Sequence, residues 1–221
     1  MLSIIEITAR EQLYQFFASL FLKEPSREWL EGLIATTPYL KTLFAEEISF
    51  QEWDRLIDQY LQGDLTIEKI QQDFYDLFFV PVSGRYAPCV ESIVRYNKMW
   101  GETEIDLRER YEQVKFIPEK LDIYLPIKQL AMSDHLGYEL AYMAHLCNME
   151  THSRMELRQR IQEEEIEMLE GHLIPFIKGY AESFISIATG TFYALFVQLV
   201  QKFLELDRQM ILNSEVNGYG E

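Results

Sequence analysis

Apolar side chains recur with the period of an α-helix along almost all of this 221-residue chain. Leu13, Phe16, Phe17, Leu20 and Phe21, for example, follow the i, i+3, i+4, i+7, i+8 spacing that places side chains on one helix face. No convincing run of alternating apolar and polar residues marks a β-strand. Ten glycines and seven prolines are also few for a turn-rich β fold. We therefore predict an all-α fold, a single-domain bundle of roughly ten helices.

Local signals predict where several helices begin and end. Pro38 lacks an amide hydrogen and should stop the second helix of the chain. Ser49 and Glu52 have the spacing of a capping box, which predicts a helix start at this point. Thr66 is expected to cap the next helix, and Gly63 to close the preceding one.

We expect residues 1–212 to form one domain. The stretch from Pro118 to Ser133 has the weakest helical signal, so a hinge near residues 118–133 is the one plausible internal boundary. The polar tail 213–221 should fray from the last helix.

One stretch is long enough to cross a membrane, because no charged residue lies between Glu182 and Lys202. Polar residues such as Ser183, Thr191 and Gln198 interrupt it, and their transfer into lipid is unfavourable. We therefore expect a central helix of a soluble bundle and no stable membrane insertion.

The formal charge of −16 argues against nucleic acid or an anionic membrane as partner and favours a basic one. The N-terminal residues lack the basic region of a signal peptide, since Glu6 precedes any long apolar run. Cys89 and Cys147 form no CxxC pair, and two free thiols fit a reducing compartment. We expect a cytoplasmic protein.

Motifs for metals and cofactors are absent from the sequence. None of the four histidines has an acidic residue three positions before it, and no HExxH occurs. The chain also contains neither a Gly-Lys dipeptide nor GxGxxG, which excludes the standard phosphate-binding loops. We predict no metal site and no cofactor.

One enzymatic alternative stays open. Cys89 in a loop, with His135 as its base and Asp134 as the orienting group, has the residue types of a cysteine-dependent hydrolase. Sequence separation permits this contact without requiring it.

Two segments far apart in the sequence suggest a binding site instead. The first runs from Asp73 to Ser92, and its helix end turns into a loop bounded by Pro81 and Pro88. The second opens with an acid–histidine pair at a helix start, where Ser133 or Asp134 is expected to be the N-cap. Glu91 either caps the helix after the loop or binds a cation. We expect one site where this helix start meets the loop.

These segments resemble those of the TorD/DmsD/NarJ family of redox-enzyme maturation chaperones. An aromatic-rich segment, a Gly/Pro loop and a Pro-x-x-Glu-Ser turn of that family correspond to Asp73–Phe78 and Pro88–Ser92. Its Asp-His-Leu-x-x-Glu-Leu-x-Phe-Met signature corresponds to Asp134–Met143. A weaker third part corresponds to His172-Leu173 with Phe176, and to Phe192-Tyr193. The order and spacing cover most of the chain.

The resemblance implies a cytoplasmic, non-catalytic chaperone with an all-helical, TorD-like fold. It implies that the partner is the catalytic subunit of a molybdoenzyme, bound in its apo form before export or assembly, together with its twin-arginine leader peptide. The family's groove residues, carried over to this sequence, are Phe74, Leu77, Phe78, Asp134 and His135, with Pro88, Glu91, Ser92 and Glu139 shaping or extending the groove.

The residue chemistry fits that expectation. Carboxylates of Glu91, Asp134 and Glu139 suit the guanidinium groups of a basic peptide, and aromatic rings suit its apolar part. A permanent structural subunit of a redox complex is a further alternative. The chain is expected to be a monomer or a domain-swapped dimer.

Overall fold

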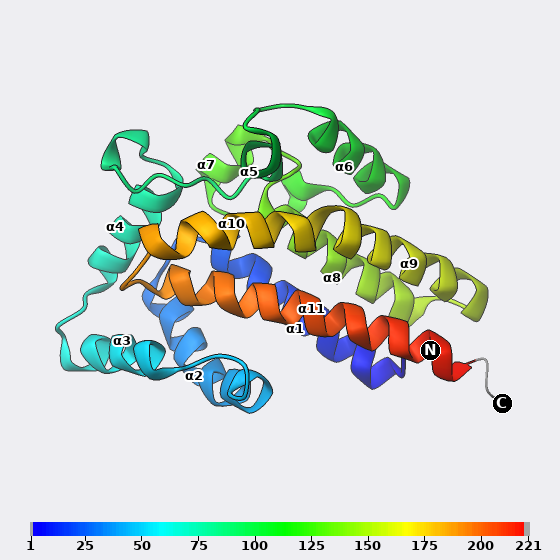
Figure 1. Cartoon of the computed structure of the whole chain (residues 1–221), viewed down its shortest axis with the longest axis horizontal. Coiled ribbons are helices and arrows are strands. Elements are labelled where there is room, and N and C mark those ends of the chain that lie inside the picture. The colour runs from blue at the N-terminus through cyan, green and yellow to red at the C-terminus, as the bar shows by residue number, and fades with distance from the viewer. Residues whose placement is uncertain (1, 219–221) are drawn as a thin grey trace. The chain divides into compact units, whose positions relative to one another are not determined.

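The computed structural model describes residues 2–218, with side chains through Ser214, and it is helical almost throughout (Figure 1). In chain order the helices are α1 (Ile4–Leu22), α2 (Arg27–Phe44), α3 (Gln51–Gln62), α4 (Ile67–Phe78), η1 (Pro81–Ser83), α5 (Glu91–Tyr96), α6 (Glu102–Gln113), η2 (Pro118–Lys120), α7 (Leu125–Leu130), α8 (Leu136–His152), α9 (Met155–Met168), η3 (Leu169–Leu173), α10 (Ile174–Ile187) and α11 (Phe192–Gly218). No β-strand occurs among the described residues. The predicted all-α class is confirmed.

The chain divides into two compact units. Of the described residues, unit 1 comprises 2–23, 90–179 and 203–218, and unit 2 comprises 24–89 and 180–202. Helices α10 and α11 each contribute to both units. The expected hinge segment, residues 118–133, lies inside unit 1. A single domain with a hinge at that place stays a prediction.

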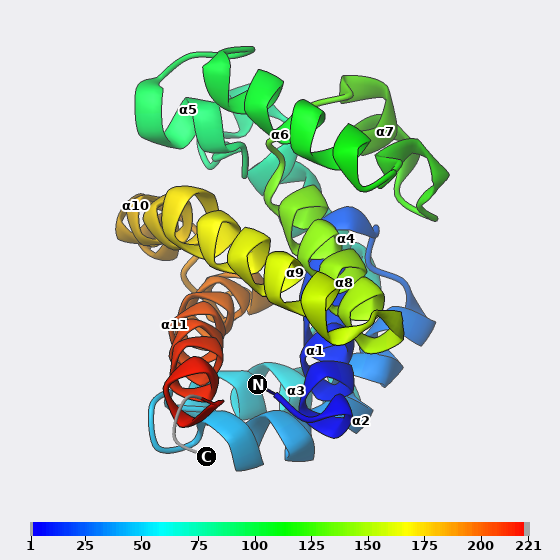
Figure 2. The ribbon, with the colours of Figure 1, turned by 90° about the vertical axis from the view of Figure 1, so that its right-hand side faces the viewer.

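In unit 1, α1 and α8 lie along each other in opposite directions (Figure 2). Near one end, a Cβ built on Gly137 would lie 2.5 Å from the Leu22 Cγ atom, so the absence of a side chain permits the close approach. Toward the other end, Asn148 Nδ2 donates to Glu11 Oε1 at 3.1 Å. Helix α9 then packs against α8.

A buried ionic cluster joins four helices of unit 1. The Arg10 guanidinium on α1 lies 2.7 Å from Glu165 on α9, 2.6 Å from Asp207 on α11 and 3.4 Å from Glu150 on α8. The Tyr14 hydroxyl also donates to Asp207, at 2.7 Å. All five side chains are buried, so water supplies little solvation and Arg10 provides the positive charge that compensates the acidic groups.

Unit 2 is organised around aromatic side chains. The Trp53 ring on α3 packs edge-on against Phe192 and Phe196 of α11, with centroids 5.8 and 5.7 Å apart. Its indole nitrogen donates to Thr37 Oγ1 on α2 at 2.9 Å, so the buried donor is satisfied. These contacts hold α2, α3 and the first turns of α11 together.

Two predicted helix boundaries are wrong. Helix α2 runs through Pro38 to Phe44, because Leu40 and Phe44 extend its buried face beyond the proline, and this burial offsets the lost hydrogen bond. The predicted capping box at Ser49 does not form, since Phe50 occupies the N-cap of α3 without a side-chain hydrogen bond. The Thr66 cap is confirmed, as its hydroxyl accepts from the Lys69 amide.

The uncharged stretch between Glu182 and Lys202 is not one helix. A turn at Gly190, whose φ of 80° suits glycine, separates the end of α10 from the start of α11. None of the described helices combines the length and apolarity that a membrane span requires. Helix α11 continues to Gly218, into the stretch expected to fray, and residues 219–221 of that expected tail lie outside the described part of the chain.

Candidate functional site

The acid–histidine pair occupies the start of α8, but with different roles from those expected. His135, not Ser133 or Asp134, is the N-cap, and its Nδ1 accepts from the Gly137 amide at 3.1 Å. Burial lowers the pKa of His135 to about 4, so the imidazole is neutral near pH 7 and keeps the lone pair that the cap requires. A neutral ring also avoids placing positive charge at a helix N-terminus.

Asp134 holds the start of another helix. Its backbone oxygen accepts from the Glu91 amide at 2.8 Å, and its Oδ2 accepts from the Ser92 amide at 2.9 Å. An isolated antiparallel bridge pairs Val90 with His135. Asp134 thus fixes the first turn of α5 against the first turn of α8, which brings Glu91, Ser92 and the acid–histidine pair together as the sequence predicted.

Glu139, one turn into α8, is a fully buried carboxyl. Neither of its oxygens has a hydrogen-bond partner within residues 2–218, and the same holds for Asp134 Oδ1. Burial raises the pKa of Glu139 well above its usual range, nearby Glu91 and Asp134 raise it further, and Arg95 opposes the shift. Burial also raises the pKa of Asp134. Enclosure thus disfavours the charged form of Glu139 unless a cation approaches it.

Glu91 is buried as well, but it has side-chain partners that sequence reasoning missed. It pairs with Arg95 one turn later, and its Oε2 lies 2.9 Å from His172 Nδ1. Arg95 also donates to the Gly171 backbone oxygen at 2.7 Å. The i, i+4 spacing of Glu91 and Arg95 was a readable signal for the first pair, whereas no local pattern links Glu91 to His172.

The predicted aromatic wall belongs to the core of unit 2. Phe74 and Leu77 are fully buried, and Phe78 is 6% exposed. Phe78 stacks on Phe184 with centroids 5.9 Å apart, and Phe74 packs against Tyr193 at 6.0 Å. A bound ligand would reach these rings only if this packing opened.

The Pro-bounded loop is fastened to unit 2. The Ala87 amide donates to the Leu77 backbone oxygen at 2.8 Å, and the Tyr180 hydroxyl donates to the Ala87 oxygen at 2.6 Å. An ion pair of 2.6 Å joins Arg85 to Asp73. Pro88 is half-buried at the end of this loop.

The nine predicted site residues therefore fall into two groups. Glu91, Ser92, Asp134, His135 and Glu139 meet in unit 1, while Phe74, Leu77, Phe78 and Pro88 belong to unit 2. Within residues 2–218, no group of three His, Cys, Asp or Glu side chains has the arrangement of a metal site. The unit 1 group offers buried carboxyl oxygens without donors, which suits a cationic hydrogen-bond donor such as a guanidinium group.

Comparison with known proteins decides the family. A family model described as nitrate reductase delta subunit matches residues 47–182, more than half of the chain and both groups of predicted site residues. The chain belongs to the TorD/DmsD/NarJ family of redox-enzyme maturation chaperones. Members of this family are chaperones, so the chain is not an enzyme and the cysteine-hydrolase alternative falls away.

The TorD-like resemblance extends over nearly the full length. The chain is 22% identical to "Chaperone protein TorD" of Shewanella piezotolerans over 214 residues, 95% of each chain. It is 24% identical to the protein of the same name from Shewanella pealeana over 216 residues, 94% of this chain and 91% of that protein. No solved structure matches it.

Proposed function

We propose that this TorD-like chaperone works in the cytoplasm on the catalytic subunit of a molybdoenzyme oxidoreductase. It binds the twin-arginine leader peptide of that subunit, or the apo subunit itself, while the cofactor is inserted and before export or assembly. Family membership supports the class of client. The observation that carries the leader-binding part is the set of buried carboxyls at Glu91, Asp134 and Glu139, two of which have oxygens without hydrogen-bond partners in the described chain.

These carboxyls suit the arginine pair of the leader. A guanidinium group binds a carboxylate through two parallel hydrogen bonds, which an ammonium group does not reproduce. Glu139 and Asp134 are fully buried, so an arginine reaches them when the Val90–Ser92 segment separates from Asp134. The cost is two hydrogen bonds, from the Glu91 and Ser92 amides, and the guanidinium supplies new donors in their place.

The apolar part of the leader is assigned to Phe74, Leu77, Phe78 and Pro88. Their burial in unit 2 means that leader binding must also loosen the packing around Phe78 and Phe184. Whether both residue groups serve one peptide stays a prediction. The description of the matched family, nitrate reductase delta subunit, supports a second form of the proposal, in which the client has no leader and the apo subunit is the ligand.

Calorimetric titration with a twin-arginine leader peptide tests the leader-binding form. Wild-type protein should bind it with micromolar or better affinity and bind a Lys-Lys version at least about tenfold more weakly, because bidentate contacts are lost. Glu139→Gln and Asp134→Asn keep the side-chain shape and should each weaken binding by about tenfold or more. Glu52→Gln, which removes a solvent-accessible carboxylate far from these residues in the sequence, should leave the affinity unchanged.

The outcomes separate the forms of the proposal. Wild-type affinity in both carboxyl variants would refute the site assignment. No binding of the leader by the wild-type protein would refute leader recognition, and titration with the purified apo catalytic subunit then tests the leaderless form.

A further inference from the structure

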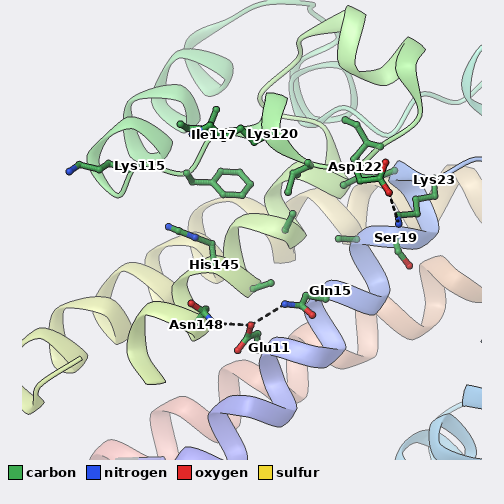
Figure 3. A pocket seen from close by; sticks show the side chains of 17 residues that line it. Glu11, Gln15, Ser19, Lys23, Lys115, Ile117, Lys120, Asp122, His145 and Asn148 are labelled. Atoms are coloured by element: carbon green, nitrogen blue, oxygen red, sulfur yellow. Dashed lines mark hydrogen bonds and ion pairs between the residues drawn. The ribbon is translucent and has the colours of Figure 1, made fainter. Parts of the chain in front are cut away.

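A cavity of about 570 Å³ lies in unit 1, away from the residues assigned to the client (Figure 3). One side is formed by α1 and α8, and the other by the segment from Lys115 to Ile123 that follows α6. Its volume falls within the usual range for pockets that bind small molecules, roughly 300 to 1,000 Å³. The site is independent of the leader-binding proposal.

The interior of this cavity is mainly apolar. Ala18, Ala141 and Ala144 line it where α1 and α8 approach each other, and Phe116, Ile117 and Leu121 face it from the other side. Lining residues on α1 extend from Glu11 to Leu22, a rise of about 16 Å along a helix. The cavity is thus elongated, with room for a single extended hydrocarbon chain.

The segment opposite the helices is held at both ends, which keeps the cavity open. At one end His145 Nε2 lies 3.1 Å from the Val114 backbone oxygen, and the His145 ring packs on Phe116 at 5.5 Å. At the other end the Tyr124 amide donates to the Leu22 backbone oxygen at 2.8 Å. The residues between these anchors span the cavity.

The rim is cationic in a chain that carries a net charge of −16. Three of the nine lysines line the cavity, against two acidic side chains, Glu11 and Asp122. Both acidic groups have partners (Figure 3). Asp122 Oδ2 is 3.5 Å from Lys23 Nζ, and Glu11 Oε1 accepts hydrogen bonds from the side-chain amides of Gln15 and Asn148. Lys115 and Lys120 have no ion-pair partner within the described part of the chain, and both are exposed. Both belong to the segment opposite the helices, Lys120 beside Ile117 and Lys115 pointing outward at one edge of the cavity (Figure 3).

We propose that this cavity binds a free amphiphilic anion, a single-chain carboxylate whose hydrocarbon part lies along the alanine-lined floor. The carboxylate stays at the rim, where an unpaired lysine meets it while the lysine stem covers apolar surface. The apolar lining accounts for the hydrocarbon chain, and the two unpaired ammonium groups account for the sign of the head group.

Calorimetric titration with dodecanoate, kept below its micelle concentration, tests the proposal on the full-length protein. The expected result is saturable binding to one site, at least tenfold stronger than binding of dodecyltrimethylammonium, which has the same chain and the opposite charge. Ala141→Phe fills the cavity from a half-buried position and should weaken dodecanoate binding by tenfold or more, with an unchanged circular dichroism spectrum confirming the fold.

Charge reversal provides the matched control. Lys115→Glu with Lys120→Glu should weaken dodecanoate binding about tenfold. Lys98→Glu with Lys178→Glu changes the net charge equally at exposed positions outside the cavity and should have no effect. Absence of saturable binding, equal binding of the cationic amphiphile, or equal effects of the two double variants would overturn the proposal. Cosedimentation with phosphatidylglycerol vesicles, without binding of monomeric dodecanoate, would overturn it in favour of a membrane surface.

Discussion

His135 caps α8 only while its imidazole is neutral, because protonation of Nδ1 removes the acceptor used by the Gly137 amide. Its folded-state pKa of about 4 lies below the usual value of 6.5. As the pH falls below 6.5, the unfolded chain takes up this proton first. The group therefore contributes stability at neutral pH that is lost between about pH 6.5 and 4.

Replacing His135 by asparagine keeps a good N-cap residue at the start of α8 but removes the group that titrates. Wild-type protein should lose about 2 kcal/mol of unfolding free energy between pH 7 and pH 5 through His135. His135→Asn should lack this part of the loss, as measured by urea denaturation at both pH values. Parallel pH profiles for the two proteins would show that His135 does not titrate in this way.

Arg10 is the single cation among three buried carboxylates. Arg10→Met should lower the unfolding free energy by about 3–5 kcal/mol, because it leaves buried charges without compensation. Urea denaturation followed by circular dichroism measures this loss. Arg55→Met, which removes an exposed pair with Glu52, should cost less than about 1 kcal/mol. Similar losses in both variants would contradict the importance of the buried cluster.

The sequence predicted the residues at the start of α8 but did not predict the Arg10 cluster. The pair Asp134-His135 and the neighbouring Glu139 were identifiable because they are adjacent on one helix start. The partners of Arg10 are 140 to 197 positions away in the sequence, so no local pattern connects them. Burial is also a property of the folded chain, so the sequence did not indicate that Glu139, expected to shape or extend the groove, is fully enclosed.

At the scale of elements, the contact between α1 and α8 depends on a missing side chain. A Cβ at position 137 would lie 2.5 and 2.7 Å from two carbon atoms of Leu22, so Leu22 would have to move. Gly137→Ala should therefore lower the unfolding free energy by about 1–3 kcal/mol through overpacking. Gly32→Ala is the control, because its Cβ meets nothing within 4 Å inside α2, and it should stabilise by about 0.5–1 kcal/mol. Equal effects of the two substitutions would refute the steric argument.

The apolar periodicity of the sequence predicted where the helices lie, but local signals predicted the helix ends less accurately. Thr66 and Gly63 act as the sequence indicated because their neighbours along the chain provide the hydrogen bonds. Pro38 fails as a stop signal because Leu40 and Phe44, in the turns that follow it, are buried in the folded protein. The start of α5 is held by Asp134, 42 positions away from Ser92, so no local cap marks it.

At the scale of the whole molecule, the charge of −16 should act on encounter more than on the bound state. A basic leader peptide is attracted to an anionic protein while the two are still apart. Salt weakens this long-range attraction, because the Debye length is about 10 Å at 0.1 M ionic strength and only about 3 Å at 1 M. Contacts to buried carboxyls are screened much less. Under the proposed function, the association and dissociation rate constants should therefore respond differently to salt.

Stopped-flow measurements with a fluorescent leader peptide test this separation. Raising sodium chloride from about 0.02 to 0.5 M should lower the association rate constant by about tenfold or more, and change the dissociation rate constant much less. The Lys-Lys peptide has the same charge, so it should show the same salt dependence of association. It should dissociate faster at every salt concentration, because an ammonium group lacks the bidentate geometry of a guanidinium. A dissociation rate constant that rose with salt as steeply as the association rate constant fell would place the arginines on the exposed surface instead of at Asp134 and Glu139.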